Sequence, residues 1–575
     1  MSTDSDAAEV VLLRNARVID GSGDEGRSAD VLVVGDRIAE VGAGLSAPSR
    51  ASIVDLDGLV LAPGFIDPHT HFDAQVLWDR DLTPSSSFGV TTVIAGNCGF
   101  TIAPNRPETR DALTRTLENV EGIPLAALEA GITWGFESFD EYLTCVAAQD
   151  LRLNFGAYVG HTAIRHEVLG ADATEREATA AEIERMAAIV SDAVGAGAFG
   201  VSSSMLGEIG AYGRPVASTF ATHDELRALA VASGTHGPRV VQILVPVTFD
   251  LSLLAEFASL SGGTVLWGPA LAARWGGPGT LSKMLDDFES TAGARIVGST
   301  HSMPIEQEVS FRDPTALRLV TPAFIEALAL PRDGDARDRL FADPSWLERA
   351  EAGVVPRMRS RLDRMRIVHC PSEPSLEGRT LAVCAAERGT TPLGLMTALS
   401  NADRLSARFI LAISNDDEVE LAGILRDRRT LLALSDAGAH TAQICDASYA
   451  LRLLGKWVRE LGALRLGEAV HALSAQPAEV LGLRERGRIA SGMAADLVAF
   501  DPDTVGDGPL RQVSDLPAGA TRMTRDAIGV HHVWVNGTRI RRDQVDLDAR
   551  GGRVLRAGGP NPGDSPNKGR SRPEL

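Results

Sequence analysis

The chain has 575 residues and a formal net charge of −20, from 76 acidic and 56 basic side chains. Charges of both signs are scattered along it, which argues against a nucleic-acid-binding surface and for a soluble protein. No apolar run approaches membrane-spanning length, and the polar start MSTDSDAAEV lacks a signal-peptide pattern. The five cysteines are odd in number and form no CxxC pair, so we expect no disulfide framework and a cytoplasmic protein.

Both ends of the chain have the pattern of short β-strands. Apolar residues partly alternate in VVLLRNARVID and ADVLVVGDRIAEVG near the start, and again in ADLVAFDPDTV and GVHHVWVNGTRI near the other end. We therefore expect residues 1–62 and 484–548 to meet in one small β domain. The segment 549–575, which is rich in Gly, Pro, Ser and charged residues, is predicted to be a disordered tail.

The middle of the chain, residues 63–483, alternates between buried-type strands and helical segments. Strand-like stretches such as VTTVIAGNCGF, GAFGVSSSM, RVVQILVPV and LLALSDAGAH are separated by amphipathic segments such as TAAEIERMAAIVSDAVGAG. This alternation is typical of a parallel α/β sheet. With the strand at 60–67 there are eight main strands, which favours a closed (β/α)₈ barrel over an open sheet. A ninth candidate, RIVHC at 366–370, fits an insertion into the barrel.

Two histidines follow the first barrel strand, in the stretch PGFIDPHTHFD at 63–73. Residues i and i+2 of a strand point to the same face, so His69 and His71 can reach one ion. At the carboxyl end of a barrel strand, that face opens onto the active site of the fold. Two polar residues in an ordinary strand-to-helix loop would give the same pattern, and the setting on strand 1 favours a metal site.

Two further residues close hydrophobic strands at the same end of the predicted barrel. Cys98 in GNCGF can supply a thiolate, a ligand that suits Zn²⁺ as imidazole does. Asp436 in ALSDAGAH can take a proton from water that a metal activates and pass it to a leaving group. Simpler alternatives are a buried, inert thiol for Cys98 and a helix N-cap for Asp436.

The HxH pair on strand 1, the aspartate on strand 8 and the terminal β segments together resemble the amidohydrolase superfamily. The stretches GFIDPHTHFDAQ, GNCGF, GHTAIR, SDAGAH and RGRIASGMAADLVAFDP look more like its N-acyl-D-amino-acid deacylase (D-aminoacylase) branch, over roughly residues 8–540. The resemblance implies a (β/α)₈ barrel with a small β-sandwich, bound zinc, and hydrolysis of an N-acyl amide. It also implies that Cys98 matches the cysteine that has the metal-bridging role in this branch.

Lysine usage excludes one feature of the superfamily. Many dinuclear members bridge their metals with a carboxylated lysine on strand 4. This chain has only three lysines, Lys283, Lys456 and Lys568, and its fourth strand ends in Ser202–Ser204. The carboxylated-lysine bridge is therefore excluded.

The deacylase branch also supplies metal-binding histidines from strands 5 and 6. Strand 5 of this chain carries Gln242 where we would look for the first, and strand 6, VLWGPALAARW, contains no histidine. The expected ligands of a single Zn²⁺ are His69, His71, Cys98 and Asp436. Either the ion is weakly held or an unusual ligand completes its site, for which His301 and His161 are the nearest candidates; a second metal is not expected.

Candidate substrate-binding residues come from polar loops at strand ends. They are His161 and Arg165 in GHTAIR, Arg379 in SLEGRT, His301 after strand 7, and His440 one turn after Asp436. Arginine is the natural bidentate partner of a carboxylate, which an N-acyl amino acid would present. In a chain this rich in arginine, a surface ion pair explains any single one equally well.

The sequence thus predicts a zinc-dependent amidohydrolase that acts on a small N-acylated substrate, with Asp436 as the catalytic proton carrier. A cyclic amide or imide hydrolase, like hydantoinase or dihydroorotase, would use the same residues. A barrel that binds a ligand without hydrolysing it is a further alternative, which the retained HxH and SDAGAH motifs disfavour. No nucleic-acid or membrane partner is expected. The sequence leaves open the chirality of the substrate, its acyl group and whether the chain forms homo-oligomers.

Overall fold

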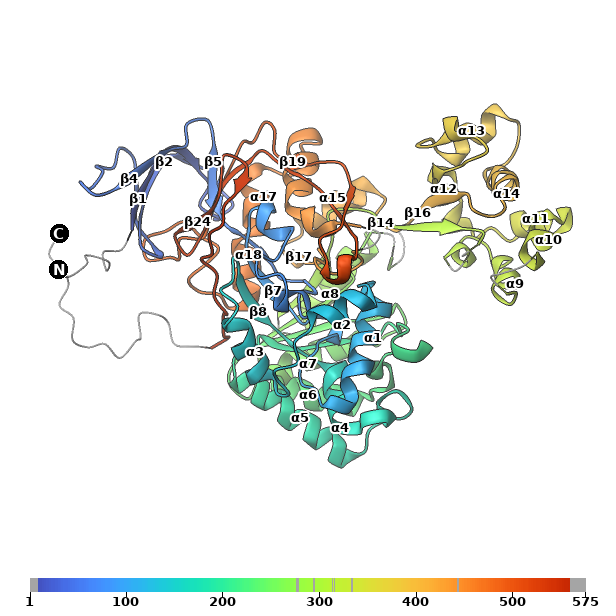
Figure 1. Cartoon of the computed structure of the whole chain (residues 1–575), viewed down its shortest axis with the longest axis horizontal. Helices are drawn as coiled ribbons and strands as arrows, with labels where there is room; N and C mark the ends of the chain where they lie inside the picture. The colour runs from blue at the N-terminus through green and yellow to red at the C-terminus, as the bar shows by residue number, and fades with distance from the viewer. Residues whose placement is uncertain are drawn as a thin grey trace. The chain divides into compact units, whose positions relative to one another are not determined.

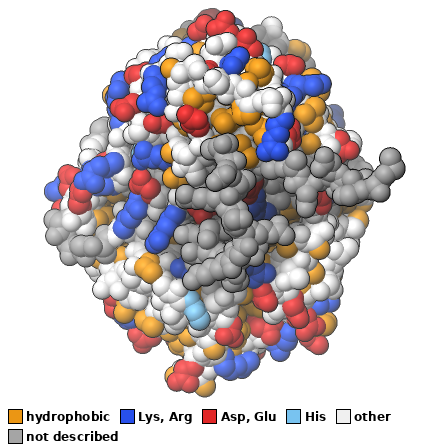
Figure 2. All heavy atoms as spheres, turned by 90° about the vertical axis from the view of Figure 1, so that its left-hand side faces the viewer, with side chains coloured by type: hydrophobic (Ala, Val, Ile, Leu, Met, Phe, Trp, Pro, Cys, Tyr) orange, Lys and Arg blue, Asp and Glu red, His pale blue; other side chains and the backbone are white. Residues whose placement is uncertain are grey.

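The computed structural model describes residues 9–272, 274–275, 279–292, 295–312, 314, 316–331, 335–441 and 444–558 (Figure 1). The chain divides into two compact units. Unit 1 comprises Met1–Leu271, Trp275–Ser302 and Ala422–Leu575, and unit 2 comprises Ala272–Arg274 and Met303–Leu421. Within the described residues, no helix is both long and apolar enough to cross a membrane. On the face shown in Figure 2, acidic and basic side chains are interspersed, with no large area of one sign.

Strands from both ends of the chain share one nine-stranded sheet in unit 1, with the order β25-β24-β23-β18-β5-β1-β2-β3 and with β4 beside β1. One face of this sheet is buried by alternating aliphatic residues, among them Leu13, Val31 and Leu497, together with Trp534. The strands are β1 (Val10–Val18), β2 (Arg27–Val34), β3 (Arg37–Gly42), β4 (Ser52–Asp55), β5 (Val60–Pro63), β18 (Leu497–Phe500), β23 (Val530–Val535), β24 (Thr538–Arg542) and β25 (Val545–Asp546). The chain between β18 and β23 forms two small two-stranded sheets. One pairs β19 (Gly506–Asp507) with β22 (Ala527–Ile528), and the other pairs β20 (Arg511–Val513) with β21 (Arg522–Thr524).

The middle of unit 1 is the α/β barrel that the strand–helix alternation predicts. Its parallel strands pair in chain order, as β6-β7-β8 and β9-β10-β11-β12-β13-β17, and β8 and β9 are nearly continuous in the chain. A parallel bridge between Thr70 and Ala437 joins the segments that follow the first and last strands. The strands are β6 (Phe65–Asp67), β7 (Val90–Ala95), β8 (Asn154–Ala157), β9 (Val159–Gly160), β10 (Gly200–Ser204), β11 (Val240–Leu244), β12 (Thr264–Gly268), β13 (Arg295–Thr300) and β17 (Thr430–Leu432).

Amphipathic helices connect the barrel strands. In α5 (Ala180–Gly195), a capping box formed by Thr179 and Glu182 begins the helix, and Met186 and Val190 are buried on one face. The other helices of unit 1 are α1 (Arg110–Glu121), α2 (Leu125–Gly131), α3 (Phe139–Ala147), α4 (His161–Leu169), α6 (His223–Ser233), α7 (Ser252–Ser261), α8 (Thr280–Ala292), α16 (Tyr449–Arg452), α17 (Leu466–Leu473) and α18 (Ala475–Leu481). α15 (Glu418–Arg426) contains the boundary between the two units.

The segment that begins the predicted tail is bonded to the barrel. The Phe155 N–H donates to the Arg553 carbonyl at 3.0 Å, and the Leu555 N–H donates to the Phe155 carbonyl at 2.7 Å. Leu555 and Ala557 pack against the buried cluster inside the barrel. Residues 559–575 of the predicted tail lie outside the described residues.

Unit 2 has its own sheet and core. Its strands pair antiparallel in the order β14-β16-β15, and an aromatic cluster of Phe311, Phe324, Phe341 and Trp346 lies in its core. The ninth strand candidate of the sequence is β15, so it lies in this separate sheet. The elements are β14 (Ile305–Ser310), β15 (Arg366–His369), β16 (Arg408–Ser414), α9 (Phe324–Leu328), α10 (Ala336–Ala342), α11 (Pro344–Ala352), α12 (Arg359–Arg364), α13 (Leu381–Glu387) and α14 (Pro392–Ala402).

Candidate metal centre

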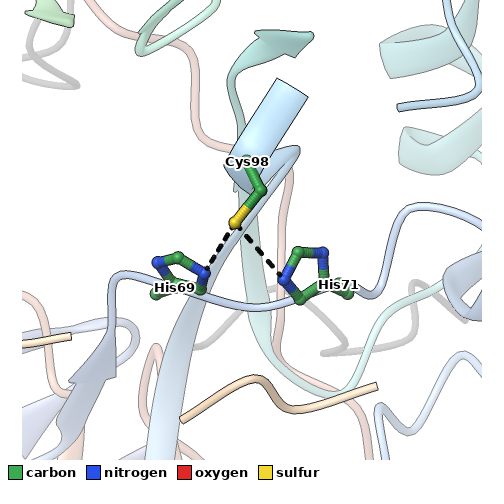
Figure 3. A group of neighbouring side chains, drawn as sticks. All are labelled: His69, His71 and Cys98. Carbon is green, nitrogen blue, oxygen red and sulfur yellow. Dashed lines mark hydrogen bonds between the residues drawn. The ribbon is translucent and has the colours of Figure 1, made fainter. Parts of the chain in front are cut away.

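Three side chains from two neighbouring strand ends point toward one another in the barrel (Figure 3). His69 and His71 follow β6, and Cys98 lies in the loop after β7. The Cys98 Sγ is 3.3 Å from Nε2 of His69 and 3.9 Å from Nε2 of His71. All three side chains are buried. Strand pairing between β6 and β7 thus brings together donors that are 27 to 29 residues apart.

The backbone at Cys98 is held in an uncommon conformation. Its φ is +58°, in the left-handed region that residues with a side chain rarely adopt. Two side chains from neighbouring strands fix this loop: the Cys98 N–H donates to Oε1 of Gln242 at 2.8 Å, and the Gly99 N–H donates to Oγ of Ser202 at 3.0 Å. The GNCGF loop therefore depends on β10 and β11 to aim the thiol.

Asp436 brings a carboxylate to the same point from the loop after β17. Its Oδ1 is 3.1 Å from Nε2 of His69 and 3.7 Å from Nε2 of His71. Burial favours its neutral form, but hydrogen bonds from the two imidazoles outweigh burial and hold the pKa of Asp436 well below its ordinary value. Burial also opposes the charge of His71, yet Glu121 and Asp436 raise its pKa to about 9.

The donor atoms fit one metal ion. Ligands about 2.0–2.3 Å from a tetrahedral zinc-type ion lie about 3.3–3.8 Å from one another. The contacts of Cys98 and Asp436 with the two imidazoles span 3.1 to 3.9 Å. Burial and nearby carboxylates raise the pKa of the Cys98 thiol, so a cation is needed here to favour the thiolate. His69, His71 and Cys98 therefore fit a single ion with nitrogen and sulfur ligands, and the Asp436 carboxylate lies beside both imidazoles.

Two buried aspartates of the PGFIDPHTHFD stretch support this loop. Asp67 accepts hydrogen bonds from Ser435 Oγ at 2.6 Å and from the His69 N–H at 3.3 Å. Asp73 accepts from the Gly96 N–H at 3.0 Å. Burial raises the pKa of each carboxyl to about 7. Neither aspartate is among the residues predicted from the sequence, although each is two residues from a predicted ligand.

The predicted substrate residues His161 and Arg165 lie in a closed network. His161 Nδ1 is 2.9 Å from Ser203 Oγ, and its Nε2 is 2.7 Å from Oε1 of Glu225. The Arg165 Nη1 contacts both oxygens of Glu225 at 2.6 Å. His161, Arg165 and Glu225 are each 0% exposed. The Arg165 guanidinium thus binds the carboxylate of Glu225. A direct contact of His161 or Arg165 with substrate stays a prediction.

The other predicted substrate residues are dispersed. The buried His301 has its Nε2 3.8 Å from Oδ2 of Asp446, and the His440 N–H donates to the backbone carbonyl of Glu121. In the part of the chain that the structure describes, the cluster of metal-type donors comprises His69, His71 and Cys98, with neither His161 nor His301 in it. Arg379 belongs to unit 2, where its guanidinium pairs with Glu387 at 2.5 Å.

Comparison with known proteins shows the family of this chain. A model of the amidohydrolase family matches residues 52–249 and 351–541. The chain belongs to this family. A D-aminoacylase of Alcaligenes xylosoxydans xylosoxydans, a relative, is 30% identical over 547 residues, which cover 95% of this chain and 97% of the relative. The resemblance drawn from the sequence motifs is thereby confirmed.

Solved structures of family members extend the match to the fold. A D-aminoacylase with a binuclear metal centre superposes with a TM-score of 0.62 at 28% identity, over 95% of this chain and 99% of the other. An N-acyl-D-glutamate deacylase of Bordetella bronchiseptica superposes with a TM-score of 0.63 at 25% identity, over 96% and 100%. The latter was solved with zinc and a phosphonate inhibitor that mimics the tetrahedral intermediate. The predicted fold class, a family barrel with a second domain, is confirmed.

Proposed function

We propose that this chain is a zinc-dependent amidohydrolase that removes the acyl group from an N-acyl amino acid, with N-acyl-D-amino acids as the first candidates. The observation that carries the proposal is the cluster of His69, His71 and Cys98 inside the barrel, with the Asp436 carboxylate beside both imidazoles. The D preference is supported by the relatives, which include a D-aminoacylase and an N-acyl-D-glutamate deacylase.

His69, His71 and Cys98 would hold the ion, with Asp436 beside it as a fourth ligand. When bound, Zn²⁺ supplies an acidified water and a Lewis acid for the acyl carbonyl. One ion is proposed, because Gln242 occupies the strand-5 position and its Oε1 is already bonded to the Cys98 backbone. The carboxylated lysine of dinuclear superfamily members has no counterpart, since β10 ends in serine.

Asp436 is the proposed proton carrier. An aspartate carboxylate is anionic at neutral pH and can accept the proton of the attacking water. It then returns that proton to the departing nitrogen, so that the amine leaves neutral. Its backbone is in the left-handed region, with φ +46°. From the loop after the last barrel strand, its side chain reaches the two imidazoles that follow the first strand.

Metal content and a substrate panel test the proposal together. Elemental analysis of the purified protein should find about one zinc per chain, and His69→Ala should lose it. The zinc protein should release amino acids from N-acetyl-D-amino acids faster than from their L isomers. Ring opening of hydantoins or dihydroorotate without deacylation would favour the cyclic-amide alternative. A zinc-loaded protein that hydrolyses neither class of substrate would contradict catalysis by this site. The remaining alternative would then be a barrel that binds a ligand without hydrolysing it.

A further inference from the structure

The interior of the barrel changes from apolar to polar along β11, β12 and β13. Val240, Leu266 and Val297 point into the buried cluster at the centre of the barrel. Side chains alternate along a strand, so the residues two positions further on face the same way and lie closer to the carboxyl ends. These residues are Gln242, Gly268 and Ser299. Each of these residues therefore lies toward the end of its strand at which Cys98 and the histidines gather.

The carboxamide of Gln242 has a fixed orientation. The Cys98 N–H needs an acceptor, so the oxygen of the amide must face it, at 2.8 Å. Nε2 is then directed elsewhere, about 2.2 Å from Oε1 by amide bond lengths. It is buried and has no hydrogen-bond partner among the described residues. Gln242 is 0% exposed, which makes an unpaired N–H donor costly.

A second unsatisfied polar atom lies on the inner face of β13, two strands from β11. Ser299 is 0% exposed, and its Oγ also has no partner within the described part of the chain. Between the two strands, Gly268 contributes no side chain. A Cβ at this position would lie 3.2 Å from Cβ of Ser299 and 3.1 Å from Cδ2 of Leu244, so a larger residue would crowd the space beside the serine.

Two buried polar atoms without partners among the described residues indicate a place for a ligand with an acceptor atom. An amide N–H can only donate, so the group that it meets must be an oxygen or another acceptor. The amide is bonded to the backbone of Cys98, which places this acceptor at the reaction centre and not at a remote part of the substrate. In amide hydrolysis at this centre, the oxygen of the scissile acyl group is an acceptor that must come close to Cys98.

We propose that Nε2 of Gln242 donates a hydrogen bond to the acyl oxygen of the substrate, with Ser299 Oγ lining the same subsite. This assignment rests on the amide hydrolysis proposed above. As water adds to the carbonyl carbon, the π electrons of the C=O bond move onto the oxygen, and the Gln242 N–H meets an increasingly negative acceptor. Gln242 therefore has two tasks, since Oε1 fixes the Cys98 loop while Nε2 stabilises the developing charge.

Gln242→Glu tests the donor, because it keeps an oxygen for the Cys98 N–H and replaces the amide NH₂. Loss of one such donor lowers kcat about 10²–10³-fold. We expect this fall with KM and zinc content within about twofold of the wild type. Binding of a methylphosphonamidate of the best amino acid, measured by calorimetry, should weaken by a similar factor, while binding of the free amino acid is unchanged. Ser299→Ala should show the same pattern more weakly.

Several results would overturn the assignment. If Gln242→Glu keeps full kcat, the amide is not a donor to the reacting oxygen. If zinc content and activity fall in parallel in Gln242→Glu and in Gln242→Met, the residue only holds the Cys98 loop. An equal loss of affinity for phosphonamidate and amino acid would mean uniform binding. A wild type that neither hydrolyses any N-acyl amino acid nor binds the phosphonamidate would overturn the proposed function as well, which separates the two failures.

Discussion

Oε1 of Glu121 lies 3.2 Å from Nδ1 of His71, and both side chains are 3% exposed. Glu121 is the last residue of α1, and its backbone carbonyl accepts from the His440 N–H in the loop that follows β17. The side chain of Glu121 thus contacts a predicted metal ligand, and its backbone binds the loop that follows β17. A carboxylate beside the second nitrogen of a metal-ligating histidine fixes the ring and its tautomer.

Glu121→Gln should therefore weaken metal binding without removing a ligand. Loss of an outer carboxylate partner typically costs 10–100-fold in metal affinity, and we expect an effect of about that size. Competition with a chromophoric chelator measures the affinity directly. Glu129→Gln, at an exposed position of α2, is the matched control and should bind zinc like the wild type. Equal affinities in the two variants would show that Glu121 does not position His71.

Asp436→Asn should separate proton transfer from metal binding. The amide cannot accept the proton of the attacking water, so kcat should fall about 10²–10⁴-fold. His69, His71 and Cys98 remain, so the variant should still bind zinc, though less tightly. Elemental analysis after dialysis and initial rates on the best N-acyl substrate give the two readouts. Activity like that of the wild type would exclude Asp436 as the proton carrier.

The donor cluster could be predicted because each member follows a barrel strand in the sequence. His69, Cys98 and Asp436 each stand just after an apolar run, and parallel strands place their carboxyl ends together. Glu121 gave no such signal. It lies on a helix among other charged residues, and nothing local shows that its side chain turns inward to His71.

A sequence motif does not show which residue a buried polar side chain will contact. Arg165 stands in a polar motif at a strand end, which suits a substrate-binding arginine, but its guanidinium contacts Glu225, sixty residues away in the chain. The role of Gln242 also depends on a long-range contact, here with the Cys98 backbone. Strand periodicity predicts that these side chains are inside the barrel or at its rim. It does not reveal which group each will meet.

Residues 549–558 are expected to stabilise the barrel. Ending the chain after Asp548 removes the Leu555 packing and its hydrogen bonds to β8. Leu555 is partly buried, so its packing contributes less than the ~1.5–3 kcal/mol of a fully buried leucine. Each hydrogen bond adds about 1 kcal/mol, so we expect a loss of about 3 kcal/mol. A chain that ends after Gly558 is the matched control. Thermal unfolding should distinguish the two truncations, and equal midpoints would mean that the segment adds no stability.

His166 on α4 should make the protein sensitive to mild acid. Its side chain is 6% exposed, and burial lowers its pKa to about 4. An unfolded histidine has a pKa of about 6.5, so between these values the unfolded chain binds the extra proton and the folded chain does not. The stability of the native protein that depends on a neutral His166 is complete above pH 6.5 and is lost as the pH falls toward 4.

Comparing the pH dependence of stability in the wild type and in His166→Gln separates the contribution of His166 from that of other titrating groups. Between pH 7 and pH 5, the wild type should lose about 2 kcal/mol of unfolding free energy more than His166→Gln does, because glutamine cannot take up a proton. Urea unfolding at the two pH values measures the difference. His236→Gln, at an exposed histidine, should keep the wild-type pH dependence. If His166→Gln also keeps it, the His166 side chain is not held neutral in the folded protein.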